Sequence, residues 1–125
     1  MIIDTDVLIW SMRGNLRAAQ AIQENSPFSI TWITYLELLQ GARSRAEQNK
    51  IVAEINRLEV TVLHATQEQS ALAITVFRDY HLSSSLDIAD AINAAQAMST
   101  GQALLSSNKK HYGSIKELRY KVFKP

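Results

Sequence analysis

Short β-prone runs alternate with helical segments along the chain, and this alternation limits the possible folds more than any other feature. Strands are expected over residues 1–4, 28–31, 60–63, 102–106 and 118–123, and helices over 5–12, 16–23, 34–40 and 86–98. Two further helices are expected after the capping patterns Ser44–Glu47 and Thr66–Gln69. Strands that alternate with helices predict an α/β fold, with a mainly parallel central sheet flanked by helices.

Length and composition predict one globular domain over residues 1–125, with 46% hydrophobic and 20% charged residues. The absence of Cys excludes disulfides, zinc–thiolate sites and thiol nucleophiles, and it suits a cytoplasmic protein. No apolar run reaches the length of a membrane span, so no membrane contact is expected. The net charge of +1 is too small to indicate a nucleic-acid partner by itself.

Three acidic residues stand among apolar neighbours. Asp4 ends the run Met1–Ile3, Glu37 interrupts an apolar helical segment, and Asp90 lies in a segment of mostly Ile and Ala. A buried carboxylate that stays ionised must be paired, hydrogen-bonded or bound to a metal, because an uncompensated buried charge costs several kcal/mol. Together, the three acids predict a site for a divalent metal ion.

Most of these acids also have an ordinary structural explanation. Asp4 could be the N-cap of the helix that begins at residue 5, and Asp6 could be a first-turn acid that the helix dipole favours. The patterns Thr34–Glu37 and Ser84–Asp87 both fit a capping box. For these positions, spacing alone leaves capping and metal binding open.

Asp90 is the exception in the sequence pattern. In a helix over residues 86–98 it would lie beyond the first turn, where capping no longer applies. That segment carries no Lys or Arg that could neutralise it. Asp90 is therefore expected to need a charged partner from elsewhere in the fold, or a metal ion.

Further polar residues follow the expected fourth strand. Asp4 ends the first strand, and Ser106 and Asn108 stand at the end of the fourth. Because ligands gather at the carboxyl ends of parallel strands, at the switch point of strand order, these residues are expected at one edge of the sheet. Their ordinary explanation is that both are turn residues, with Asn108 capping residues 109–112. The histidines form no ligand-spaced pair, which argues against a zinc site.

Four segments in order resemble the motifs of PIN-domain ribonucleases. The opening Met1–Ile9 has an apolar strand followed by Asp-Thr-Asp-Val-Leu-Ile, and Thr34–Gly41 has a Glu followed by a Gly. Ile88–Ala95 is similar to the third motif, an Asp that leads into an Ile/Ala-rich helix, and Leu104–Tyr112 is similar to the fourth. The length and the style of the motifs resemble the VapC-like branch, the toxins of toxin–antitoxin pairs.

The resemblance implies an endoribonuclease that hydrolyses RNA phosphodiester bonds with Mg²⁺ or Mn²⁺. Asp4 and Asp90 would bind the metal directly, and Glu37 directly or through water. Ser106 and Asn108 would orient water or a scissile oxygen. Mg²⁺ prefers a few carboxylates plus waters, which agrees with this set of residues.

The sequence departs from the family pattern at several positions. Ser106 stands where Thr is usual, and Asn108 stands where some members carry a fourth acid, which would suit one metal rather than two. Asp6 replaces the usual Asn and would add charge to the site. Asp87 has no clear family counterpart.

The resemblance also implies a cytoplasmic homodimer that is neutralised by a cognate antitoxin protein. The antitoxin could contact the apolar region of Trp32, Tyr35 and Leu39, although core packing is the first expectation for these side chains. The basic segment 109–124 is expected at the surface, where it could contact phosphates that flank the site.

Three alternatives remain at this stage. A haloacid-dehalogenase-like phosphatase would use Asp4 and Asp6, but Leu8 stands where its motif has Thr or Val. A non-catalytic receiver domain would need an Asp after the third strand, where His64 stands. A PIN fold retained only for binding is the third alternative.

Overall fold

The structure is a computed structural model that describes residues 1–125, and it is built on a five-stranded parallel sheet. The strands are β1 (Ile2–Ile3), β2 (Ser29–Thr31), β3 (Thr61–Leu63), β4 (Leu104–Ser106) and β5 (Tyr120–Val122). The helices are α1 (Thr5–Met12), α2 (Leu16–Glu24), α3 (Trp32–Gln40), α4 (Arg45–Arg57), α5 (Gln67–Ser84), α6 (Ile88–Thr100) and α7 (Lys109–Tyr112). The predicted α/β class is confirmed. None of the helices combines the length and the apolar character that crossing a membrane would require.

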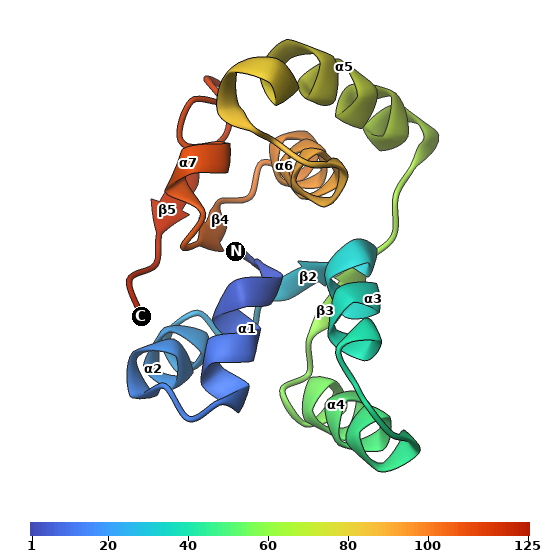
Figure 1. Ribbon diagram of the computed structural model, residues 1–125, viewed down its shortest axis with the longest axis vertical. Helices are drawn as coiled ribbons and strands as arrows, with labels where there is room; N and C mark the ends of the chain where they lie inside the picture. The colour runs from blue at the N-terminus through green and yellow to red at the C-terminus, as the bar shows by residue number, and fades with distance from the viewer.

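Helices cover both faces of the sheet, and each face has its own hydrophobic core. Consecutive residues of a strand point to opposite faces. Ile3 and Leu105 accordingly pack with α1 to α4, while Ile2 and Leu104 pack with α5, α6 and the segment around Tyr112. Figure 1 shows this division, with α1 and α2 on one side of the strands and α5 and α6 on the other. Burial on both faces explains why the two central strands, β1 and β4, are apolar apart from Ser106.

The strand order β3-β2-β1-β4-β5 creates a switch point beside the first strand. From β1 the chain proceeds outward to β2 and β3, and then returns to place β4 on the other side of β1. Asp4 directly follows β1, and Ser106 ends β4. The register pairs Ile3 with Leu105, so the two polar side chains leave the sheet at the same edge. The predicted grouping of Asp4 with Ser106 is confirmed.

Two helix starts differ from the prediction, and both change the meaning of an acid. Helix α3 begins at Trp32, with Thr31 as its N-cap, so Glu37 lies too far along the helix to cap it. Helix α6 begins at Ile88, with Asp87 as its N-cap. Asp90 is therefore the third residue of α6, and the two acids form a capping box in which each side chain accepts from the other's backbone N–H. The expectation that Asp90 lies beyond the first turn was wrong.

Candidate metal-binding site

Asp4 is held at the centre of the site by groups from three elements. Its Oδ1 accepts hydrogen bonds from the Thr5 backbone N–H at 2.8 Å and from Asn93 Nδ2 at 3.1 Å. Its Oδ2 accepts one from the Ser106 hydroxyl at 2.8 Å. The residue is only 6% exposed, and this burial, together with the charge of Asp6, raises the pKa of its carboxyl to about 7. Asp4 is thus a carboxyl group that would need a nearby cation to be fully ionised at neutral pH.

Glu37 joins the same site from α3. The hydroxyl of Thr5 donates to its Oε1 at 2.8 Å, and Thr5 is the residue whose N–H also binds Asp4. Partial burial raises the pKa of Glu37, and the charges of Asp87, Asp90 and Asp6 act in the same direction. The charge of Asp90 also raises the pKa of Asp4, so Asp90 acts electrostatically on both of the other acids.

Asp90 enters the site from the first turn of α6. It is 5% exposed, and its Oδ2 lies 2.6 Å from Nδ1 of His111 on α7. Burial raises the pKa of the Asp90 carboxyl, although hydrogen bonds from the Asp87 backbone, Tyr112 and His111 oppose this effect. Helix capping and the contact with His111 therefore supply part of the compensation that the sequence analysis expected from a charged partner or a metal ion.

Asn93 connects the buried parts of the site, and the sequence analysis did not single it out. It lies one turn after Asp90 on α6 and is 1% exposed. Its Oδ1 accepts a hydrogen bond from the Thr31 hydroxyl, and its Nδ2 lies within hydrogen-bond distance of Asp4 Oδ1 and, at 3.3 Å, of the Tyr112 hydroxyl. A polar residue on the same helix face as Asp90, in an otherwise apolar segment, was the available signal.

The supporting residues occupy distinct positions. Ser106 is fully buried; its hydroxyl donates to Asp4 and accepts from the Asn108 N–H at 3.1 Å. Asp6 Oδ2 accepts hydrogen bonds from the backbone N–H and the hydroxyl of Ser107. Asn108 is exposed at the start of α7, and its side chain makes no capping hydrogen bond. Of these residues, only Asn108 presents a free polar side chain to solvent.

The donor set fits a divalent cation. The ion pairs of the molecule are Arg43–Glu47, Arg57–Glu54 and His111–Asp90, so no Lys or Arg neutralises Asp4, Glu37 or Asp90. The pKa of each of these three carboxyls is raised, which means that ionising all three without a counter-charge costs free energy. A cation with oxygen ligands would remove this cost.

A second arrangement of possible ligands shares only one residue with this set. Asp87, Asp90 and His111 offer ligand atoms that all lie within 4.8 Å of one another. An imidazole ligand suits Zn²⁺ and related ions more than Mg²⁺, and Asp87 Oδ1 is already engaged in capping α6. We favour the carboxylate set for Mg²⁺ or Mn²⁺ on this chemical ground, with His111 acting as a hydrogen-bond partner of Asp90.

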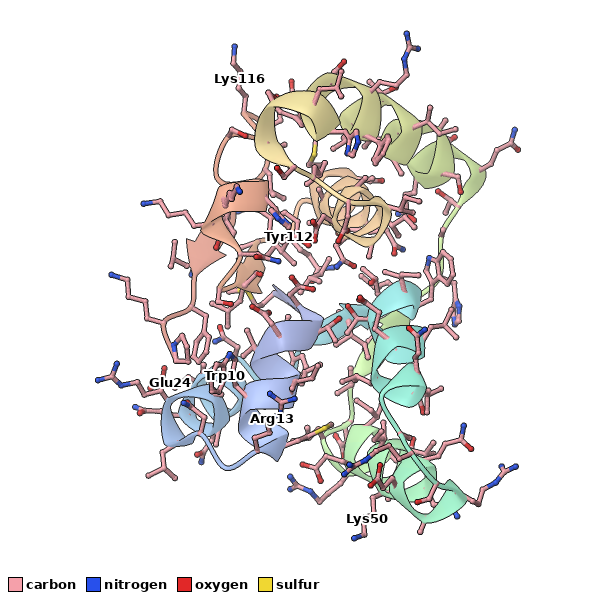
Figure 2. All side chains as sticks on the ribbon, viewed as in Figure 1. Trp10, Arg13, Glu24, Lys50, Tyr112 and Lys116 are labelled. Carbon is pink, nitrogen blue, oxygen red and sulfur yellow. The ribbon has the colours of Figure 1, made fainter.

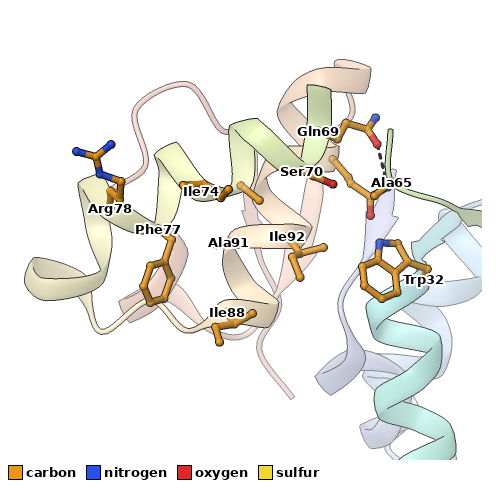
Figure 3. Close-up of a pocket in the computed structure, with 12 residues that line it drawn as sticks. Trp32, Ala65, Gln69, Ser70, Ile74, Phe77, Arg78, Ile88, Ala91 and Ile92 are labelled. Carbon is orange, nitrogen blue, oxygen red and sulfur yellow. Dashed lines mark hydrogen bonds between the residues drawn. The ribbon is translucent and has the colours of Figure 1, made fainter. Parts of the chain in front are cut away.

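An apolar pocket of about 480 Å³ lies between α3, α5 and α6, next to the start of α6 (Figure 3). Ile74 and Ile88 line it although they are 63% and 70% exposed. Trp32 Nε1 and Gln96 Oε1, from two other residues of the lining, have no hydrogen-bond partner. Large exposed apolar side chains gathered at one place are typical of protein contacts.

The family follows from comparison with known proteins. The PIN domain family profile matches residues 1–116, and the chain therefore belongs to the PIN domain family. The phosphatase and receiver alternatives are not favoured. The sheet order also differs from the 2-1-3-4-5 order of receiver domains. Asp6, the acid of the phosphatase alternative, is occupied by its hydrogen bonds to Ser107.

Several solved structures share the fold. A toxin–antitoxin complex from Klebsiella pneumoniae contains a chain with a TM-score of 0.81 and 23% identity, covering 94% of this chain and 93% of that one. DNA-bound VapBC from Salmonella typhimurium contains a chain with a TM-score of 0.79 and 18% identity, covering 97% of this chain and 96% of that one. VapBC-1 from nontypeable Haemophilus influenzae contains a chain with a TM-score of 0.77 and 21% identity, also covering 97% of this chain and 96% of that one. No curated protein sequence matches this chain.

Proposed function

We propose that this chain is a VapC-like toxin, an endoribonuclease that hydrolyses RNA phosphodiester bonds with Mg²⁺ or Mn²⁺. One observation carries the proposal: Thr5 contacts both Asp4 and Glu37, the charge of Asp90 raises the pKa of both, and no Lys or Arg neutralises the three acids. PIN domains are generally metal-dependent nucleases, and the structures with similar folds named above are toxin–antitoxin complexes.

The three carboxylates would hold the ion, Asp4 and Asp90 directly and Glu37 directly or through water. A bound Mg²⁺ or Mn²⁺ would lower the pKa of a coordinated water and stabilise negative charge on the scissile phosphate. Hydrogen bonds within the chain orient the carboxylates: Thr5 orients Glu37, while Ser106 and Asn93 orient Asp4. Since ligand orientation depends on such partners, Ser106 would act through Asp4 rather than on the substrate.

The exposed residues around the carboxylates would meet the RNA. Asn108 has a free side-chain amide, which could donate to a phosphate oxygen or position the attacking water. Lys109 and Lys110 are exposed on α7, the short helix that also carries His111. Their charge would attract phosphates next to the scissile bond.

The proposal includes two protein partners in the cytoplasm. A cognate antitoxin would cover the site, and a second copy of the chain would form a homodimer. The apolar pocket around Ile74 and Ile88 has the character of a protein contact and is our candidate surface for the second copy. Trp32, Tyr35 and Leu39 line another pocket of about 350 Å³, which shares only Trp32 with the first and is our candidate surface for the antitoxin.

The decisive experiment is cleavage of RNA by the purified protein. We expect cleavage with Mg²⁺ or Mn²⁺, its loss with EDTA, and a loss of at least about a hundredfold in Asp4→Asn and Asp90→Asn, since each would remove a metal ligand. Asp79→Asn, at an exposed acid on α5, is the matched control and should keep full activity. Full activity in both site variants would refute the assignment, and release of phosphate from small monoesters would favour a phosphatase.

A further inference from the structure

A groove distinct from the two pockets described above begins at the candidate site and runs away from it. It has a volume of about 610 Å³ and lies between the end of α1, the outer half of α3 and helix α4. Glu37 forms part of its wall, so the groove and the site share a residue. Ile9, Met12 and Ile51 give it apolar surface.

The groove carries two cations that no acid neutralises. Arg43 and Glu47 both line the groove and pair at 3.5 Å, and Glu54 of the lining pairs at 2.6 Å with Arg57, which lies outside it. Arg13 and Lys50 also line the groove, are exposed, and form no ion pair. Figure 2 shows Arg13 at the end of α1 and Lys50 on α4, both on the side of the molecule opposite α5. The groove is therefore acidic where it meets the site and basic farther out.

We propose that this groove holds the single-stranded RNA on one side of the scissile bond, with Arg13 and Lys50 contacting its phosphates. This inference rests on the proposed function. A phosphodiester at the carboxylates has nucleotides on both sides, and α7 with Lys109 and Lys110 is available to only one of them. The groove receives the other, because its wall includes Glu37.

The lining suits a nucleic acid more than an ordinary peptide. Single-stranded RNA presents apolar base faces and one negative charge per nucleotide, which matches apolar side chains beside isolated cations. Met12 is 44% exposed in the groove and offers such a surface to a base. A peptide would have to be strongly acidic to use Arg13 and Lys50 in the same way.

The salt dependence of RNA binding tests the proposal. In an inactive Asp90→Asn background, a single-stranded RNA oligonucleotide is titrated at several salt concentrations with and without Arg13→Gln and Lys50→Gln. Each phosphate contact that is lost should reduce the slope of log K against log salt by about 0.7. Arg17→Gln and Arg45→Gln remove exposed cations outside the groove and should leave the slope unchanged.

A kinetic experiment separates binding from chemistry. In the otherwise native protein, Arg13→Gln and Lys50→Gln should raise KM for a long RNA and leave kcat unchanged, and they should not affect an oligonucleotide too short to reach the groove. An unchanged slope and KM, in a protein that does cleave RNA, would overturn the inference. So would variants that bind RNA normally but lose binding of a synthetic Glu-rich peptide. Absence of any RNA cleavage by the native chain would instead refute the proposed function.

Discussion

Nδ1 of His111 lies 2.6 Å from Oδ2 of Asp90, which joins the short helix α7 to the first turn of α6. Asp90 has no Lys or Arg partner, so this imidazole is the only basic side chain that forms an ion pair with it. The same oxygen accepts from the Asp87 backbone N–H. His111 therefore fixes the orientation of the carboxylate that we propose as a metal ligand.

Removing this contact should weaken metal binding. We expect His111→Ala to lower Mn²⁺ affinity by about tenfold to a hundredfold, since partners that orient metal ligands contribute effects of that size. His111→Asn retains an N–H donor near the position of Nδ1 and should restore most of the affinity. Isothermal titration calorimetry measures both, with His64→Ala as the control at an exposed histidine. Wild-type affinity in His111→Ala would show that the pair is independent of metal binding.

The stability of the metal-free protein should fall as the pH rises toward neutrality. The pKa of Asp4 is about 7 in the folded protein against 3.8 for a free side chain, so the folded state binds more protons between these values. Its contribution is complete below about pH 4 and is lost as the pH rises through about 7, with a total of a few kcal/mol.

Urea unfolding in EDTA at about pH 5 and about pH 8 measures this change. Mn²⁺ should stabilise the protein more at the higher pH, where the carboxylates are ionised. Asp4→Asn should flatten the pH dependence, whereas Asp79→Asn should not. A metal-free protein that becomes more stable from about pH 5 to about pH 8 would contradict the assignment of Asp4.

Asp87 should act as a helix cap rather than as a ligand. Its Oδ1 accepts from the Asp90 N–H at 2.8 Å, so Asp87→Ala should lower the free energy of unfolding by about 1 kcal/mol. Asp87→Asn should be nearly neutral, because Asn caps as well as Asp. Ser44→Ala, at the N-cap of α4, provides a comparable loss remote from the site. If Asp87→Asn kept its stability but bound Mn²⁺ as poorly as Asp90→Asn, Asp87 would be a metal ligand.

The apolar pocket should mediate self-association. Ile74→Glu combined with Ile88→Glu places charges among apolar side chains and should shift the homodimer to monomer in sedimentation velocity. Leu82→Glu is the matched control, because Leu82 is 93% exposed on α5 and does not line the pocket. A dimer that survives the double substitution would locate the interface elsewhere.

The sequence predicted the fold class because strands alternate with helices along the chain, and it predicted the grouping of Asp4 with Ser106 because both follow from where the parallel strands end. It misplaced the start of α6 because Leu86, fully buried, resembles the apolar residues of the helix that follows. Leu86 is apolar because it packs in the core beside Val76 and Tyr112, not because it belongs to that helix. A local pattern does not separate these two causes of burial.

Contacts between distant segments were beyond the sequence pattern. His111 reaches Asp90 only after α7 packs against α6, and Asn93 reaches Asp4 only after α6 packs beside β1. No spacing rule relates either pair. The alternative of Glu37 as a helix cap could not be rejected either, because the true cap, Thr31, is also the last residue of β2. The structure was needed to show which acids cap a helix: Asp4 caps α1 and Asp87 caps α6, whereas Glu37 caps none.

The central position of the two-residue strand β1 has a consequence for the chain during its synthesis. Asp4 leaves the ribosome before Ser106, which orients its carboxylate and follows 102 residues later. The strand that carries Ser106 must dock beside β1 before the site exists. A nascent or truncated chain that ends before β4 therefore holds the acids without the geometry, and whatever activity the site has can begin only after β4 has been made and has docked beside β1.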